Sequence, residues 1–203
     1  MPENVSDSLG SLIGGRLALD FANAGSAKRP LSWEELILFL EATQVISSQR
    51  SALLLELPEH DPGGAQALLE RASLLRSGVR QICTALIRRE PPKAEHVQPV
   101  NEALRVTEGH DELVWSGGRW KIEFVARESG LEWLLAAIAR SAAEITGEGT
   151  EARVRRCANP DCGLFFYDDS RTRRRRWCSM AVCGNRHKVA SFARKHAAKG
   201  RER

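Results

Sequence analysis

The sequence predicts a mainly α-helical protein with a small β-hairpin, divided into a helical domain over residues 1–150 and a compact domain over residues 151–203 that combines a β-hairpin with a helix. Three observations support this fold class. Apolar residues recur at helical spacing through most of the first domain, and only one short segment alternates as a strand would. Four of the five cysteines lie in the last 47 residues. Residues 151–203 hold 15 Lys and Arg against 5 Asp and Glu, whereas residues 1–150 hold 15 against 21.

The helices of the first domain are recognised by their start and stop residues. The segment Ser32–Glu35 has the form of a capping box and begins a predicted helix of about 15 residues. Asp61-Pro62 predicts the start of a long core helix that ends at Pro91-Pro92, with Cys83 on or beside its buried face. A further helix is predicted around Pro99–Val106, either beginning at the proline or kinked by it.

A change of periodicity follows these helices. The segment Leu113–Phe124 alternates, and Ser116–Gly118 divides it into a predicted hairpin with Trp120, Ile122 and Phe124 on one face. A second capping box at Ser129–Glu132 predicts another core helix. The glycines in Thr146–Arg153 stop that helix, and the charge changes sign just beyond, so we place the domain boundary there.

Composition excludes several classes of protein. A hydrophobic content of 42% is enough to fill a core, and no apolar run approaches the roughly 18 residues that a membrane span needs. The N-terminus lacks the basic start and continuous apolar core of a signal peptide. We therefore expect a cytoplasmic protein without membrane association, in which clustered cysteines are metal ligands rather than disulfides.

The four clustered cysteines have the spacing C-x4-C-x15-C-x4-C. Two close pairs joined by a returning chain are typical of a structural zinc site, because each pair supplies half of a tetrahedron and leaves no open position for catalysis. An iron–sulfur cluster and metal-free thiols are the alternatives, and the nearby His187 could replace one cysteine. We predict one structural zinc ion held by Cys157, Cys162, Cys178 and Cys183.

The residues around the cysteines predict a small fold organised by the metal. Gly163 suits a tight turn, Leu164–Tyr167 reads as a short strand, and Trp177-Cys178 reads as the returning partner of that strand. The segment after Cys183 is helical in pattern. Because such a module has too small a core to fold alone, the metal should supply most of its folding free energy.

Basic residues crowd this second domain. Arginine suits both phosphate oxygens and the acceptor edge of guanine, so they favour a nucleic-acid partner. Two alternatives stay open: the arginines could neutralise the acidic first domain or the thiolates, and the asparagine at the helix start could cap the helix instead of contacting bases. The candidate nucleic-acid-binding residues are Arg171, Arg173, Arg174, Arg175, Arg176, Asn185, Arg186, Lys188, Arg194 and Lys195.

The first domain contains no phosphate-binding loop, nucleophile elbow or metalloprotease signature, so we do not expect an enzyme. Asp20 and Asn23 are polar residues within an apolar segment and are the candidates for a site facing a small-molecule effector. Buried hydrogen bonding to nearby backbone is the alternative explanation for both residues.

The segment 153–198, with its Cys183–Arg186 motif Cys-Gly-Asn-Arg, resembles the CGNR zinc finger found at the C-terminus of bacterial proteins. The motif LALDFAN at Leu17–Asn23 resembles the start of the ABATE domain, a domain of stress-induced transcription regulators that is usually joined to this finger. The resemblance implies a treble-clef-like finger with one zinc ion on the four cysteines and a bacterial DNA-binding regulator. Where the family commonly has Asn-Thr, this chain has Asn23-Ala24.

We therefore expect a zinc-containing DNA-binding transcription regulator whose first domain senses a small molecule or mediates association. A homodimer would supply the second copy of the finger that a two-part DNA site needs. An RNA-binding or ribosome-associated protein, with Phe165, Phe166, Tyr167 and Trp177 stacking on bases, is one alternative. A protein-interaction adaptor that uses the arginines to dock on an acidic partner is another.

Overall fold

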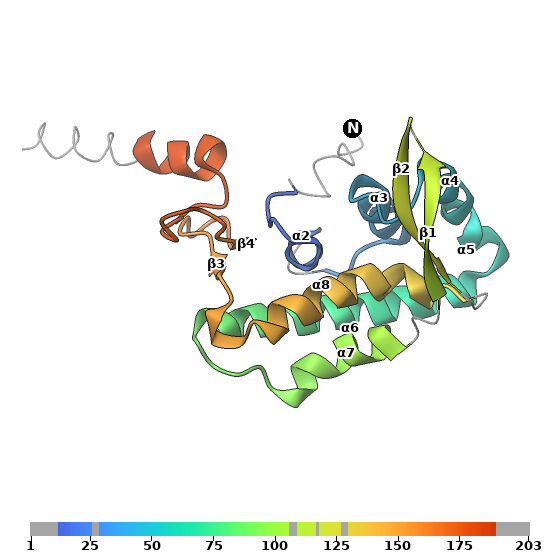
Figure 1. The fold of residues 1–203 in the computed structure, drawn as a ribbon, viewed down its shortest axis with the longest axis horizontal. Helices are drawn as coiled ribbons and strands as arrows, with labels where there is room; N and C mark the ends of the chain where they lie inside the picture. The colour runs from blue at the N-terminus through green and yellow to red at the C-terminus, as the bar shows by residue number, and fades with distance from the viewer. Residues whose placement is uncertain (1–11, 26–28, 106–108, 117, 127–129, 190–203) are drawn as a thin grey trace, which may run out of the picture.

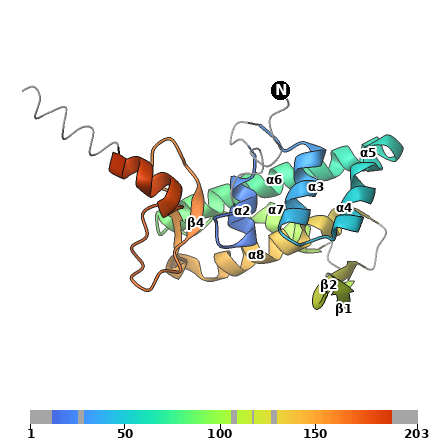
Figure 2. The same ribbon diagram turned by 90° about the horizontal axis from the view of Figure 1, so that it is seen from above.

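The structure, a computed structural model, describes residues 12–25, 29–105, 109–116, 118–126 and 130–189. It contains α2 (Leu17–Asn23), α3 (Trp33–Ala42), α4 (Ser48–Leu55), α5 (Leu57–His60), α6 (Pro62–Ile87), α7 (Ala94–Arg105), β1 (Gly109–Ser116), β2 (Arg119–Ala126), η1 (Glu132–Leu135), α8 (Ala136–Gly147), η2 (Gly149–Glu151), β3 (Val154–Arg156), β4 (Phe165–Tyr167) and η3 (Met180–Gly184). Helices α6, α7 and α8 pack on one another, and α2 packs on α6, α8 and β4 (Figures 1 and 2). The predicted mainly helical fold with small hairpins is confirmed.

Helix α3 begins at the predicted capping box. The Ser32 hydroxyl accepts a hydrogen bond from the Glu35 N–H at 3.1 Å, and the Glu35 carboxylate accepts one from the Ser32 N–H at 2.8 Å. The helix ends at Ala42 and is therefore shorter than predicted. Gln44 takes a left-handed conformation with φ of 60°, which turns the chain out of the helix before the last apolar residue of the pattern.

Helix α6 begins as predicted, because the Asp61 carboxylate accepts a hydrogen bond from the Gly64 N–H at 2.8 Å and Pro62 is the first helical residue. Cys83 lies on its buried face. The helix ends at Ile87, short of the two prolines, because the chain reverses at a left-handed Arg89. Its inward face is formed by Leu68, Ala72, Leu75, Val79, Ile82 and Leu86.

Helix α7 starts at Ala94, so of the two predicted placements the one in which the helix begins at Pro99 was wrong. Pro99 lies inside the helix, where its ring costs a backbone hydrogen bond. The close packing of α7 on α6 offsets this cost: a Cβ at Gly78 would lie only 2.7 Å from the His96 carbonyl oxygen, so the absence of a side chain lets the helices approach. The predicted end at Val106 lies outside the described residues.

The hairpin β1–β2 has the predicted antiparallel arrangement, with Leu113 opposite Ile122 and Trp115 opposite Trp120. The two tryptophan rings meet edge to face at 5.4 Å between centroids. All four of these apolar side chains are exposed. Trp120 and Ile122 therefore lie on one face of the hairpin, as predicted. The side chain of Phe124 and the turn residue Gly117 lie outside the described part of the chain.

The segment after the hairpin begins with the 3-10 turn η1 and continues as α8. Ser129, the predicted cap, lies outside the described residues, and the turn starts after Leu131 without a side-chain cap. The inward residues are those that the helical spacing predicts, and α8 ends at Gly147 as predicted. None of the described helices has the length and apolar character that crossing a bilayer requires.

The main core continues from the helices into the second hairpin. Phe21 of α2 packs on Phe39 of α3 with 5.5 Å between ring centroids, at the centre of the buried cluster. Val154 of β3 and Phe165 and Tyr167 of β4 belong to that same cluster. The cysteine-rich segment is thus joined to the helices by a shared apolar core.

Candidate metal centre and basic surface

The hairpin beside the cysteines pairs differently from the sequence-based expectation. Strand β4 was predicted to pair with Trp177-Cys178, and this prediction was wrong, because β4 pairs antiparallel with β3. The loop between β3 and β4 is the first cysteine turn itself: the Cys157 N–H donates to the Leu164 carbonyl at 2.9 Å, and Gly163 has a φ of +66°. Strands β3 and β4 directly flank this short turn and can pair as a hairpin, which favours β3 over the more distant Trp177-Cys178 as the partner of β4.

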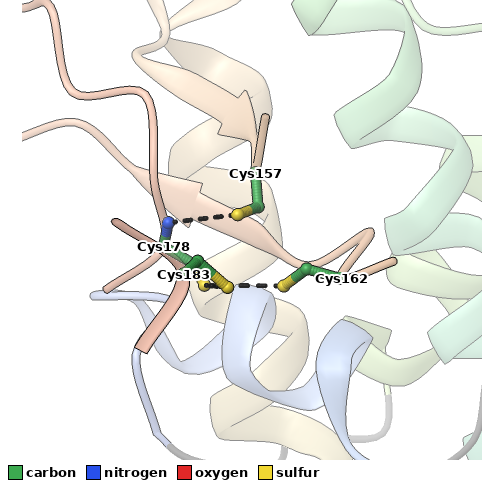
Figure 3. Close-up of side chains that lie close together, drawn as sticks. All are labelled: Cys157, Cys162, Cys178 and Cys183. Carbon is green, nitrogen blue, oxygen red and sulfur yellow. Dashed lines mark hydrogen bonds between the residues drawn. The ribbon is translucent and has the colours of Figure 1, made fainter. Parts of the chain in front are cut away.

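The four predicted cysteine ligands come together in one cluster (Figure 3). Their sulfur atoms all lie within 4.8 Å of one another. The Cys162 and Cys178 sulfurs are 3.5 Å apart, and those of Cys178 and Cys183 are 3.7 Å apart. Four sulfurs bound at about 2.3 Å around a tetrahedral zinc ion would be about 3.8 Å apart. The cluster therefore fits one zinc ion with a complete set of thiolate ligands.

Groups around the sulfur atoms support this assignment. The Cys178 N–H points at the Cys157 sulfur at 3.5 Å, and the Asn159 amide points at the Cys183 sulfur at 3.6 Å. Such donors stabilise thiolates and orient them toward a metal. His187, which could have replaced a cysteine, stacks on Trp177 instead, with 4.7 Å between ring centroids.

The fifth cysteine, Cys83, is buried in α6 and is not part of the cluster. Burial in apolar surroundings raises the pKa of its thiol to about 12. A thiol that stays protonated is a poor nucleophile and a poor metal ligand. Cys83 is therefore a core residue, as its position in the helical pattern predicts.

The cysteine-rich segment is fastened to the first domain through Asn23. Its side-chain amide donates to the Phe165 carbonyl at 2.7 Å, and its carbonyl oxygen accepts from the Phe165 N–H at 2.9 Å. The Tyr167 N–H donates to the Gly14 carbonyl at 2.7 Å, and the Tyr167 hydroxyl donates to Glu148 at 2.5 Å. Asn23 thus holds β4 to α2, while Tyr167 holds it to Gly14, which precedes α2, and to Glu148, which caps the end of α8.

The two candidate effector-site residues both make hydrogen bonds within the protein. The Asn23 amide is occupied by Phe165, which corresponds to the alternative explanation of buried hydrogen bonding, although the partner is distant in sequence. Asp20 accepts from the Gly14 N–H at 2.7 Å. Burial raises the pKa of Asp20, and the hydrogen bond from Gly14 partly opposes this effect.

Most of the candidate arginines lie on the loop that connects β4 to Cys178, which we call the arginine loop (residues 168–177). Arg171, Arg173, Arg174 and Arg176 are exposed there. Arg175 turns inward: its guanidinium donates to the Trp177 carbonyl at 3.0 Å and to the Cys178 carbonyl, and lies 4.6 Å from the centroid of the Phe166 ring. Arg175 thus braces the loop, while the other four arginines of the loop stay exposed.

A buried acid that sequence reasoning missed fixes the shape of the arginine loop. Asp168 is fully buried and accepts hydrogen bonds from the Ser170 hydroxyl at 2.5 Å and the Arg175 N–H at 3.0 Å. It also pairs with the Arg155 guanidinium at 2.8 Å. Burial acts to raise the pKa of Asp168, but these hydrogen bonds and the Arg155 charge hold it below its ordinary value. The Asp-x-Ser pattern after an apolar strand was the available signal.

The chain after the cluster is helical from Asn185 to Val189. Asn185, Arg186 and Lys188 are exposed there, and the Asn185 amide donates to the Ala181 carbonyl at 3.1 Å. Asn185 thus serves the turn η3 as a local hydrogen-bonding group. The remaining candidates, Arg194 and Lys195, lie outside the described residues.

Comparisons with known proteins agree with this arrangement. A family model described as "CGNR zinc finger" matches residues 153–196, and a model for the ABATE domain, described as "Putative stress-induced transcription regulator", matches residues 15–149. A search of curated proteins found no match. The first match covers the cysteine cluster and its hairpin, and the second covers most of the chain. The chain therefore belongs to the ABATE family, and it carries a CGNR zinc finger after the ABATE domain.

Proposed function

We propose that the protein is a zinc-dependent DNA-binding transcription regulator of the cytoplasm, in which the CGNR finger grips the DNA backbone. The observation that carries this proposal is the arginine loop: Arg171, Arg174 and Arg176 are exposed on a loop held between a buried carboxylate and a zinc site. A cation held in place loses less conformational entropy when it binds phosphate than one on a free tail.

Charge supports a nucleic-acid partner. Residues 151–203 hold 15 Lys and Arg against 5 Asp and Glu, and the exposed Arg186 and Lys188 at the start of the final helix lie next to the zinc ligand Cys183. Phosphate contacts release counterions, so affinity for DNA should fall steeply with salt. Any base contacts would come from this helix start, while the arginine loop would set the register on the backbone.

Burial of the aromatic residues favours duplex DNA over single-stranded RNA. Phe165, Phe166 and Tyr167 are all buried, so β4 offers no face on which bases could stack. Trp177 is half-buried, and its ring is flanked by the Arg176 guanidinium at 5.3 Å and by His187. Single-strand readers rely on exposed aromatic surfaces, and among the described residues this finger presents none of that kind on its hairpin.

The ABATE domain would then sense a small molecule or mediate association. Because the finger occurs once in the chain, a homodimer would let two fingers contact the two halves of one DNA site. If the protein does not bind nucleic acid, we expect the arginines to bind an acidic partner protein instead.

The test is fluorescence anisotropy of the full-length, zinc-loaded protein with a labelled DNA duplex, across a salt series. The variant Arg171→Ala/Arg174→Ala should weaken binding at low salt and reduce the slope of log affinity against log salt by about 2, because each lost phosphate contact removes about one counterion. Arg140→Ala, an exposed arginine on α8, is the matched control and should leave the slope unchanged.

Two outcomes would overturn the proposal. No binding at low salt would turn the arginine loop toward a protein partner. Stronger competition by single-stranded RNA than by unlabelled duplex at equal salt would favour the RNA-binding alternative.

A further inference from the structure

A groove lies where the ABATE domain meets the finger. It has a volume of about 530 Å³ and is lined by the C-terminal end of α6, the turn η2, strand β3 and part of the arginine loop. Its charge is one-sided: seven lining residues are arginines, from the turn after α6, the segment 153–156 and the arginine loop, and Glu151 is the one acid among the lining residues. Like charges gathered in a concave site repel one another, and a bound anion relieves that repulsion.

Four of the lining arginines are held by partners of their own and form the wall of the groove. The Arg155 guanidinium pairs with Asp168, and the Arg175 guanidinium donates to backbone carbonyls of the arginine loop. The Arg156 guanidinium donates to the Gly163 carbonyl at 3.3 Å, and that of Arg176 lies over the Trp177 ring. These contacts fix the positions of the groups that surround the groove.

The other three arginines of the groove are Arg89, Arg153 and Arg173. Their guanidinium groups make no hydrogen bond or ion pair within the described part of the chain. They come from three different segments: the turn after α6, the approach to β3, and the arginine loop. Three arginines that line one groove and make no hydrogen bond or ion pair through their guanidinium groups among the described residues are suited to a ligand that brings several negative oxygens.

Backbone geometry points to the same place. Non-glycine residues with positive φ are uncommon, and the described chain has them at Gln44, Arg89 and Arg173. Two of these three line the groove, with φ of 59° at Arg89 and 52° at Arg173. The Arg173 carbonyl accepts a hydrogen bond from the Arg155 guanidinium at 2.5 Å, which holds that residue in its unusual conformation. The left-handed Arg89 ends α6, whereas Arg173 lies in a loop, and an uncommon loop conformation that is fixed by a hydrogen bond in this way is typical of ligand sites.

The size and position of the groove favour a small ligand rather than DNA. Its volume lies within the range of small-molecule sites, roughly 300–1,000 Å³. Figure 1 places the β3–β4 hairpin between the ends of α6 and α8 on one side and the helix that begins at Asn185 on the other. DNA seated on that helix would therefore not fill a groove formed with α6.

We propose that this groove binds the di- or triphosphate group of a small molecule, with Arg89, Arg153 and Arg173 contacting the phosphate oxygens. A nucleotide and free polyphosphate share this chemistry. Because the walls belong to both the ABATE domain and the finger, the bound anion holds the two together. Given the proposed DNA-binding function, the groove is the effector site, and DNA and the anion must change each other's affinity by the same factor.

The test is isothermal titration calorimetry of the full-length, zinc-loaded protein with inorganic tripolyphosphate at physiological ionic strength. The wild-type protein should bind one equivalent. Arg89→Gln/Arg153→Gln should lower the affinity at least about 10-fold, because each lost charge-assisted hydrogen bond removes a substantial share of the binding. Arg171→Ala/Arg174→Ala, which changes the arginine loop outside the groove, should stay within about 2-fold of wild type. Arg140→Gln is the matched control for lost charge.

Zinc content and the melting temperature without anion show whether each variant is folded. Arg89→Gln alone, at an exposed turn, is a second variant that leaves the finger untouched. ATP that binds more than about 10-fold tighter than tripolyphosphate would assign the groove to nucleotides, and equal affinity would assign it to polyphosphate itself.

The proposal is overturned if tripolyphosphate shows no saturable binding, if the groove variants bind like wild type, or if the Arg171/Arg174 variant loses as much affinity as they do. The two proposals are separable. If the Arg171/Arg174 variant loses DNA binding but still binds tripolyphosphate, both proposals are supported. If the wild-type protein binds tripolyphosphate but not DNA, the groove proposal stands and the DNA-binding proposal fails.

Discussion

Asn23 pairs with both backbone polar groups of Phe165, at 2.7 Å and 2.9 Å, although the two residues are 142 positions apart. The side-chain amide thus occupies the edge of β4 that a third strand would otherwise cover. Buried backbone groups without partners are costly, so this pairing makes the position of the zinc finger depend on α2. The segment Leu17–Asn23, which lies within the match to the ABATE domain, therefore holds the CGNR finger through Asn23.

Replacement of Asn23 by Ala should lower the free energy of unfolding by about 2–4 kcal/mol, because two buried backbone groups of Phe165 lose their partners. Urea unfolding followed by circular dichroism measures this change. Asn101→Ala, at an exposed position on α7, is the control and should cost less than about 0.5 kcal/mol. An Asn23 variant as stable as the control would show that Asn23 does not hold the finger.

Removal of zinc should destabilise the ABATE domain as well as the finger. Structural zinc contributes on the order of 10 kcal/mol to the folding of small zinc domains. Phe165 and Tyr167 belong to the same buried core as the helices of the ABATE domain, so loss of zinc should affect that core as well. Calorimetry of the zinc-loaded and chelated protein should show a melting temperature lower by roughly 10 °C or more after chelation. Readdition of one equivalent of zinc should restore it. An unchanged melting temperature would mean that the ABATE domain folds independently of the zinc finger.

Thiol labelling identifies the zinc ligands. After chelation, iodoacetamide at pH 8 should modify Cys157, Cys162, Cys178 and Cys183, while Cys83 stays unmodified because burial raises its pKa to about 12. Mass spectrometry locates the adducts. Cys83→Ala should still bind one zinc ion, and Cys178→Ser should bind it weakly or not at all. Equal labelling of all five cysteines would contradict this account.

Asp168→Asn should loosen the arginine loop, since the neutral amide loses the ion pair with Arg155 and presents a donor to groups that already donate. We expect a loss of about 2–3 kcal/mol in stability and weaker DNA binding, with one zinc ion retained. Asp169→Asn is the matched control, because the neighbouring carboxylate is 74% exposed. If both variants bind DNA equally well, the buried carboxylate does not organise the loop.

Glu35 should make stability depend on pH. Hydrogen bonds from Arg29 at 2.7 Å and from the Ser32 N–H at 2.8 Å outweigh burial and hold the pKa of Glu35 below its ordinary value of 4.5. A lowered pKa adds stability that is fully present above pH 4.5 and is lost as the pH falls through the folded-state value.

The variant Glu35→Gln keeps an acceptor for Ser32 but loses the charge. Its deficit against wild type in urea unfolding should be about 1 kcal/mol at pH 7 and should shrink toward zero below about pH 4. Comparison of the two proteins at each pH cancels any acid-induced loss of zinc that they share. Glu34→Gln, at an exposed position, is the control. A deficit that grows as the pH falls would have the wrong sign for this explanation.

Local signals predicted the features that depend on neighbours in the chain. The capping box at Ser32 and the helix start at Asp61-Pro62 each join groups that are a few residues apart. The cysteine spacing is a pattern typical of metal sites and of few other structures. The helix start at residues 185–189 and the cluster of four cysteines were predicted in this way, because each depends on a short motif.

Features that depend on distant contacts could not be predicted. Strand β3 has three residues, two of them arginines, so it has no recognisable alternation. The partner of Asn23 lies in the other domain, and the groove combines the turn after α6 with the arginine loop. These sites form where segments that are distant in the sequence pack together, so the pattern of any one segment does not predict them.

The central claim, that a zinc-organised finger binds DNA, is tested most directly by anisotropy of the full-length protein with one duplex in three states: zinc-loaded, chelated and reloaded. We predict binding that is lost on chelation, is restored by one equivalent of zinc, and weakens steeply as salt is raised. Equal affinity of the zinc-loaded and chelated protein would contradict the account, because charge alone would then explain the binding.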